Sequence, residues 1–182
     1  MTGMDEGFHD ERRGRRIVVG VSGSLGSLAA LHQAVDEARR TDAEVLAVLA
    51  WLPQGGEHGY RRAPCPPLLA AWQEGAVARL REALDEAFGG APTGVRLSAQ
   101  VVRGDTGPVL VQCADRPGDL LVLGAGSGSV LRRGLRASVT AYCVKHAGRP
   151  VLAVPRPTLQ RELDALRRRS AWHLPAALVP SH

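Results

Sequence analysis

The chain has 182 residues, of which 45% are hydrophobic and 23% are charged, and its formal net charge is +5. These proportions are typical of one soluble globular domain with additional terminal segments, and they exclude a fibrous repeat and a wholly disordered chain. The positive charge is carried almost entirely by arginine, and with only 4% aromatic residues for base stacking we expect no nucleic-acid partner.

The first part of the chain alternates apolar runs with a helical pattern. Residues 16–21 (RIVVGV) are continuously apolar and β-branched, which predicts a strand buried on both faces. Apolar residues then recur at helical spacing over residues 28–38, with Ser27 as the expected N-cap. Residues 43–51 (AEVLAVLAW) predict a second buried strand.

The middle of the chain predicts a loop, a long helix and an edge strand. The proline- and glycine-rich residues 53–67 indicate the loop, and residues 68–88 carry a broad apolar stripe at helical spacing. Residues 95–102 alternate apolar and polar side chains, which is typical of a half-exposed edge strand. A turn over residues 104–108 then leads into a helix that ends near residue 114. Asp105 is its expected cap, and the alternative is that this side chain reaches the ligand crevice.

Two strands and one helix complete the pattern. Residues 119–124 (DLLVLG) and 150–154 (PVLAV) predict strands, and residues 138–146 predict the helix between them. Alternating strands and helices favour a parallel sheet covered on both sides. The expected fold class is therefore α/β: a Rossmann-like or flavodoxin-like three-layer α/β/α arrangement with a five-stranded parallel sheet in the order 3-2-1-4-5.

Two loops rich in glycine and serine follow the first and fourth strands, at residues 22–27 (SGSLGS) and 124–129 (GAGSGS). In the expected order these strands are neighbours at the switch point, where ligands bind beyond the carboxyl ends of the strands. Small residues let backbone N–H groups approach an anion closely. A second interpretation stays open, in which these residues only form tight turns. The candidate donors are Ser22, Gly23, Ser24, Ser27, Gly126, Ser127, Gly128, Ser129 and Ser138, with Arg132, Arg133 and Arg136 as candidate phosphate-neutralising side chains.

The run IVVGVSGSLGSLAAL at residues 17–31 resembles the opening of universal stress proteins, a V-D-G-S-x-x-S turn followed by an alanine-rich helix. The pair GD at 104–105, the run DLLVLG at 119–124 and the segment from SV at 138–139 to PVLAV at 150–154 are similar to that family in the same order. The resemblance covers residues 16–155. It implies a Rossmann-like domain that is commonly dimeric through its last strand.

The ATP-binding members of that family carry G-x-x-G, nine residues, and then G-S/T. On this chain the first glycine corresponds to Gly124 and the closing serine to Ser138, while Ser127 and Ala137 stand where the family has glycine. Ser22 replaces the acidic residue that follows the first strand. The nucleotide-binding residues implied by the resemblance are Ser22, Gly23, Ser24, Gly124, Gly126, Ser127, Gly128, Ala137, Ser138 and Val139. If ATP or AMP binds there, Mg²⁺ arrives with the nucleotide.

The expected organisation is a flexible N-terminal arm at residues 1–15, a universal stress protein domain at 16–157 and a basic tail at 158–182. In the tail, residues 162–169 have an amphipathic helical pattern, and residues 171–182 are expected to be disordered. The arm lacks the apolar core of a secretory signal, and no apolar run is long enough to span a membrane. The expected location is the cytoplasm.

No catalytic or metal site is indicated. Cys65, Cys113 and Cys143 are far apart, and neither C-x-x-C nor H-E-x-x-H spacing occurs. The leading hypothesis is a non-catalytic, dimeric stress sensor or adaptor. One alternative is a nucleotide-free member that acts only through protein partners. The other is an ATP-using enzyme, because residues 22–27 also resemble a degenerate S-G-G-x-D-S pyrophosphate loop.

Overall fold

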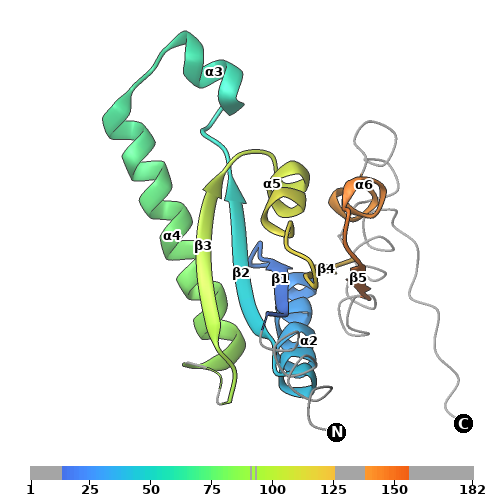
Figure 1. Cartoon of the computed structure of the whole chain (residues 1–182). Coiled ribbons are helices and arrows are strands. Elements are labelled where there is room, and N and C mark those ends of the chain that lie inside the picture. The colour runs from blue at the N-terminus through green and yellow to red at the C-terminus, as the bar shows by residue number, and fades with distance from the viewer. Residues whose placement is uncertain (1–13, 91, 93, 126–137, 156–182) are drawn as a thin grey trace, which may run out of the picture.

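The computed structural model describes residues 14–90, 92, 94–125 and 138–155 (Figure 1). Most of the expected N-terminal arm and the whole C-terminal tail lie outside these ranges. So do four of the candidate nucleotide-binding residues: Gly126, Ser127, Gly128 and Ala137. Among the described residues, no helix combines the length and apolar character that are needed to cross a membrane.

The described residues form one five-stranded, all-parallel sheet in the order β3-β2-β1-β4-β5. This arrangement confirms the predicted fold class and strand order. The strands are β1 (Arg16–Gly20), β2 (Glu44–Trp51), β3 (Leu97–Arg103), β4 (Leu120–Gly124) and β5 (Val151–Val154).

Helices cover both faces of the sheet. One apolar cluster joins the strands to α2 (Leu25–Thr41) and α4 (Pro66–Phe88), and the other joins them to α5 (Thr106–Cys113) and α6 (Val139–His146). Neighbouring residues of β1 point to opposite clusters, since Val19 belongs to the first and Val18 to the second. Both are 0% exposed, which explains why this strand is continuously apolar.

The predicted loop at residues 53–67 contains a helix that the sequence pattern did not indicate, α3 (Gly56–Arg62). Its sequence GEHGYRR has no buried residue, so it lacks the apolar periodicity on which helix prediction depends. Arg103 at the end of β3 binds Glu57 of this helix through two hydrogen bonds of 2.6 and 2.8 Å, and its guanidinium lies 4.8 Å from the centre of the Tyr60 ring. The hydrogen bonds from Arg103 lower the pKa of Glu57. A tertiary contact therefore holds α3 at the carboxyl edge of the sheet.

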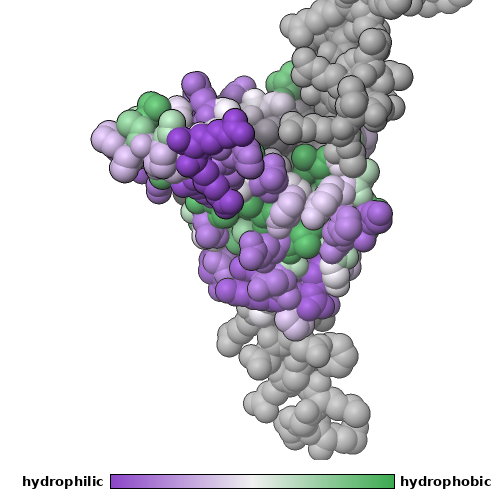
Figure 2. All heavy atoms as spheres, turned by 90° about the horizontal axis from the view of Figure 1, so that it is seen from above, coloured by the Kyte–Doolittle hydropathy of each residue, from purple (hydrophilic) through white to green (hydrophobic). Residues whose placement is uncertain are grey.

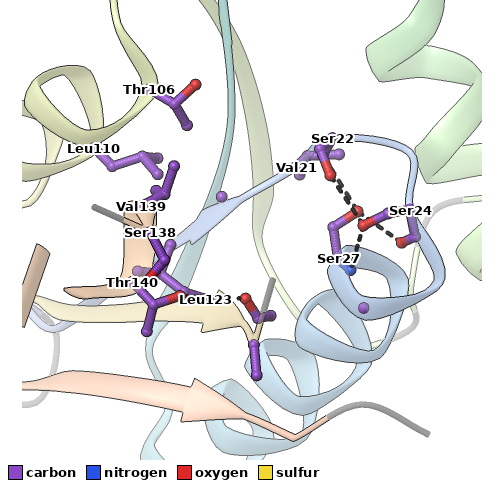
Figure 3. Close-up of a pocket in the computed structure, with 14 residues that line it drawn as sticks. Val21, Ser22, Ser24, Ser27, Thr106, Leu110, Leu123, Ser138, Val139 and Thr140 are labelled. Atoms are coloured by element: carbon purple, nitrogen blue, oxygen red, sulfur yellow. Dashed lines mark hydrogen bonds between the residues drawn. The ribbon is translucent and has the colours of Figure 1, made fainter. Parts of the chain in front are cut away.

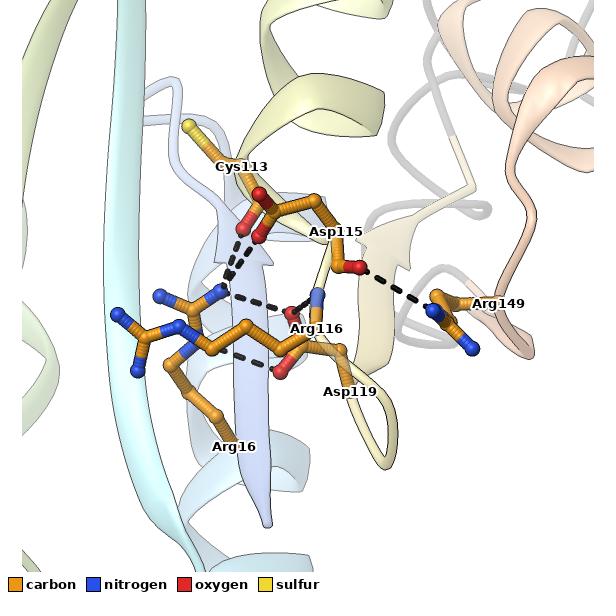
Figure 4. Close-up of polar contacts among 6 residues, drawn as sticks. All are labelled: Arg16, Cys113, Asp115, Arg116, Asp119 and Arg149. Carbon is orange, nitrogen blue, oxygen red and sulfur yellow. Dashed lines mark hydrogen bonds and ion pairs between the residues drawn. The ribbon is translucent and has the colours of Figure 1, made fainter. Parts of the chain in front are cut away.

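A buried ion pair joins the starts of β1 and β4 at the opposite edge of the sheet (Figure 4). Arg16 Nη2 donates to Asp119 Oδ2 at 2.8 Å, and Arg16 Nε lies 3.3 Å from Oδ1. The Asp119 side chain is 0% exposed and also accepts a hydrogen bond from the backbone N–H of Arg116. The hydrogen bond to Asp119 raises the pKa of Arg16. Arg16 Nη2 also donates to the carbonyl of Cys113 at the end of α5, so one side chain ties together two strands and a helix.

We predict that Asp119→Ala lowers the free energy of unfolding by about 3 kcal/mol, because it removes the buried carboxylate and leaves the Arg16 guanidinium only the exposed Asp115 carboxylate, at 3.4 Å, as a charged partner. Urea unfolding measures this loss. Asp36→Ala is the matched control, since Asp36 pairs with Arg39 on the surface of α2, where an exposed pair contributes about 0.5 kcal/mol or less. Equal losses in the two variants would contradict the role assigned to the buried pair.

Candidate functional site

A cleft of about 340 Å³ opens at the carboxyl edge of the sheet, where β1 and β4 end side by side. Figure 2 looks down on this edge and shows hydrophobic residues toward the middle of the face, with hydrophilic residues around them. The described residues that line the cleft are Gly20, Val21, Ser22, Ser24, Gly26, Ser27, Thr106, Leu110, Leu123, Gly124, Ala125, Ser138, Val139 and Thr140 (Figure 3).

Three helices begin at this cleft: α2 after Ser24, α5 with Thr106, and α6 after Ser138. The first backbone N–H groups of an α-helix have no acceptor within the helix, and the helix dipole adds partial positive charge at the same end. Three such ends around one cavity form a surface that can bind an anion or another group with several acceptor atoms.

The serines after β1 form a hydrogen-bonded turn that differs in one respect from the prediction. Ser24 rather than Ser27 is the N-cap of α2, and its hydroxyl accepts the Ser27 N–H at 3.3 Å. Ser27 is buried one turn later and uses its own hydroxyl to donate to the Ser24 carbonyl and to accept the Ser22 N–H. Ser24 and Ser27 both stand at positions suitable for an N-cap, and the earlier serine is the one that caps the helix. The Ser22 and Ser24 hydroxyls are 3.1 Å apart at the rim of the cleft (Figure 3).

Ser138 caps α6 by accepting the Ala141 N–H at 3.1 Å. A serine hydroxyl can donate one hydrogen bond in addition to those that it accepts. No described residue accepts a hydrogen bond from Ser138, so within this part of the chain its O–H can be offered to a ligand. Two residues later, Thr140 Oγ1 lies 3.5 Å from the carbonyl of Gly124 and links the start of α6 to the end of β4.

Asp105 occupies the N-cap position of α5, as expected, but its side chain makes no capping hydrogen bond. It does not belong to the described lining of the cleft, whereas the next residue, Thr106, does.

Gly124 has a packing role that requires no ligand. A Cβ atom at this position would lie 2.3 Å from the carbonyl oxygen of Gly26 and 2.5 Å from its carbonyl carbon. Real Cβ atoms do not approach backbone atoms so closely, and backbone cannot move aside as the end of a flexible side chain can. Glycine at 124 therefore lets the first turn of α2 lie directly against the end of β4.

The structure brings together six of the residues expected at the site. These residues, which line the cleft, are Ser22, Ser24, Ser27, Gly124, Ser138 and Val139. Gly23 is not among the lining residues; with φ of +72° it forms the turn between two residues that are. Gly126, Ser127, Gly128, Ser129 and Ala137 lie outside the described residues, as do Arg132, Arg133 and Arg136.

Several lining residues were not expected from the sequence. Thr106 was detectable in principle, because it begins the helix after the third strand at the same edge of the sheet. Leu110 and Leu123 reach the cleft through side-chain packing, for which the sequence holds no local signal. The lining residues that sequence reasoning missed are Gly20, Val21, Gly26, Thr106, Leu110, Leu123, Ala125 and Thr140.

The described wall of the cleft is made of hydroxyl groups, backbone groups and apolar side chains, without a charged side chain. No group of three potential metal ligands occurs among the described residues. Such a wall can hold phosphate or hydroxyl groups at the helix starts and an apolar ring against Leu110, Leu123 and Val139. It offers no paired nucleophile and base in the described part of the chain.

Comparisons with known proteins agree on one family. The model of the universal stress protein family matches residues 14–155. A crystal structure of a universal stress protein in complex with cAMP is 27% identical, with a TM-score of 0.52 over 79% of this chain and 98% of that chain. The universal stress protein UspA from Lactobacillus plantarum is 25% identical, with a TM-score of 0.62 over 78% and 98% of the two chains.

A universal stress protein family member from Burkholderia pseudomallei shares the fold at 24% identity, with a TM-score of 0.54 over 77% of this chain and 95% of that chain. Among curated protein sequences no match was found.

We predict that Gly124→Ala lowers the free energy of unfolding by roughly 1–3 kcal/mol, because the added methyl overlaps the backbone of α2. The matched control is Gly75→Ala on α4, where a Cβ meets nothing within 4 Å; there alanine raises stability by about 0.5–1 kcal/mol through its helix propensity. Thermal and urea unfolding of both variants without ligand test the packing role. Stability in Gly124→Ala equal to that of the unmodified protein would refute it.

Proposed function

The chain belongs to the universal stress protein family, and on this basis we propose that it is a non-catalytic stress sensor or adaptor of the cytoplasm, whose cleft binds an adenine nucleotide. The observation that carries this proposal is the meeting of three helix N-termini on one cleft with an apolar wall. The likeness to a universal stress protein solved in complex with cAMP supports the same ligand class.

In this proposal the phosphate groups bind at the start of α6. The Ser138 hydroxyl and the first N–H groups of that helix, at Val139 and Thr140, supply the donors. The nucleoside lies beside the loop after β1, with Ser22 and Ser24 within reach of its hydroxyl groups. Ser22 stands where the family has an acidic residue, so this contact is made by a neutral hydroxyl. With ATP as the ligand, Mg²⁺ is carried in by the nucleotide.

The described wall favours binding over catalysis. It contains no histidine, cysteine, lysine or carboxylate to act as nucleophile or base. An ATP-using enzyme is the alternative from another class, and sustained phosphate release that disappears in a Ser138 variant would favour it.

A second candidate function is that the protein binds no nucleotide and acts only through protein partners. The observation in its favour concerns Gly124. The packing of Gly124 against Gly26 explains this glycine without a ligand. The two candidates differ in one observable, which is whether the purified protein binds AMP or Mg-ATP.

We predict that Ser138→Asp weakens AMP or ATP binding by roughly tenfold or more, because a carboxylate a few ångströms from a phosphate costs about 1.4 kcal/mol or more. Aspartate is itself a good N-cap, so α6 keeps its first turn. Isothermal titration calorimetry measures the affinity. The control Gln100→Glu adds the same charge on the exposed face of β3, away from the cleft, and is expected to bind as the unmodified protein does.

Two outcomes would contradict this assignment. Absence of binding by the unmodified protein at millimolar nucleotide would favour the nucleotide-free candidate. Equal affinity in Ser138→Asp and in Gln100→Glu would place the phosphate groups elsewhere.

We further propose that two copies associate through β5. This strand has β4 as its one neighbour in the described sheet, and its exposed Ala153 leaves the edge accessible to a second strand. The family to which the chain belongs is commonly dimeric in this way.

Sedimentation velocity at micromolar concentration tests the dimer. The unmodified protein is expected to sediment as a dimer and Ala153→Lys as a monomer, because like charges then meet at the edge. The matched control Ala99→Lys changes an exposed residue of β3 at the other edge of the sheet and should leave the dimer intact. A monomeric unmodified protein would rule out the proposed association at that concentration.

A further inference from the structure

The helices α5 and α6 meet at a glycine that lies on an aromatic ring. A Cβ atom at Gly107 would lie 2.6 Å from Cδ1 and 3.0 Å from Cγ of Tyr142. Gly107 is buried and is the second residue of α5, directly after Thr106 of the cleft. These ring atoms are close to the backbone of α6, so the ring cannot yield by bending its far end. The absence of a Cβ at 107 therefore sets how closely the two helices approach.

Tyr142 is held from two other sides. Its ring stacks on that of His146 one turn later, with centroids 4.3 Å apart and planes tilted by 31°. Its backbone N–H donates to the carbonyl of Ser138 at 2.9 Å, closing the first turn of α6. The adjacent Cys143 is 0% exposed and its Sγ lies 3.9 Å from the carbonyl of Gly107. Tyr142 thus belongs to the same helical turn as the capping serine of the cleft.

We propose that Tyr142 is a positioning residue for the cleft: through Gly107 it sets the separation of Thr106 on α5 from Ser138 on α6. This inference rests on the proposed function, since the separation matters only if both helix starts bind one ligand. The hydroxyl groups of Thr106 and Ser138 are on short side chains, which cannot follow a displaced ligand. Backbone N–H groups are equally rigid, so a shift of one helix start relative to the other removes donors from reach.

The apolar contacts between α5 and the sheet have a different role. Val109 and Leu110 pack in the apolar cluster that faces β1 and β2, so they fix the distance between α5 and the sheet. Movement of α5 along the sheet, toward α6 or away from it, is limited at its N-terminal end by the contacts of Gly107 with Tyr142 and Cys143.

The test compares nucleotide affinities of folded variants by calorimetry, with AMP as the probe. Gly107→Ala is expected to bind at least tenfold more weakly, because the methyl separates the helices. Tyr142→Ala is also expected to bind more weakly, because the ring that packs on Gly107 of α5 is lost. The double variant should recover much of the affinity, since the new methyl occupies space that the ring has left. Tyr142→Phe keeps the ring and should bind as the unmodified protein does.

A merely structural role gives a different pattern. Melting temperatures would then fall in Gly107→Ala and Tyr142→Ala while the affinity of the folded protein stayed unchanged, and this result would overturn the inference. Additive losses in the double variant would overturn it as well.

A second measurement separates this inference from the proposed function. If the unmodified protein binds no AMP, the proposed function fails, and hydrogen exchange still tests the positioning role without a ligand. Val109 and Tyr142 donate the hydrogen bonds that close the first turns of α5 and α6. Their amides should exchange faster in Gly107→Ala and in Tyr142→Ala, but not in Tyr142→Phe. Unchanged exchange in all three variants would refute the positioning role.

Discussion

The carboxyl edge of the sheet depends on the approach of two backbones, Gly124 of β4 and Gly26 of α2. There is no room for a Cβ between them, so the first turn of α2 lies directly against the end of its neighbouring strand. That approach brings the cap of α2 to the same cleft as the start of α6, which Thr140 links to the Gly124 carbonyl. In the function that we propose, the same glycine corresponds to the first residue of the nucleotide motif, so its small size would serve both packing and binding.

At the opposite edge of the sheet, a buried ion pair joins β1 and β4. Arg16 and Asp119 join the starts of the two strands whose ends form the cleft, and the Cys113 carbonyl brings the end of α5 into the same network (Figure 4). β4 is therefore held at both ends, by the ion pair with β1 at its start and by close packing against α2 at its end. Such a rigid frame suits the site that we propose, in which backbone and short hydroxyl groups are the donors, because these donors cannot adjust to a ligand as long side chains do.

How far the sequence predicts this protein depends on the range of the interactions. The buried strands follow from local apolar runs, and the parallel sheet follows from the alternation of strands with helices. The order 3-2-1-4-5 comes from the known doubly wound folds, and the structure confirms it. The helix α3 was missed because a tertiary pair, Arg103 with Glu57, holds it in place of apolar periodicity. Ser22 and Ser138 were identified at the cleft from their loops, whereas Leu110 reaches it only through packing that no local pattern encodes.

We propose that the starts of α2, α5 and α6 bind one nucleotide, and an NMR titration of the backbone amides with AMP tests this most directly. We predict saturable shifts at Gly26, Thr106, Val139 and Thr140, with the same dissociation constant at each. Shifts confined to one helix start would contradict the shared site. No shifts at millimolar AMP would contradict nucleotide binding itself and leave protein partners as the function of this family member.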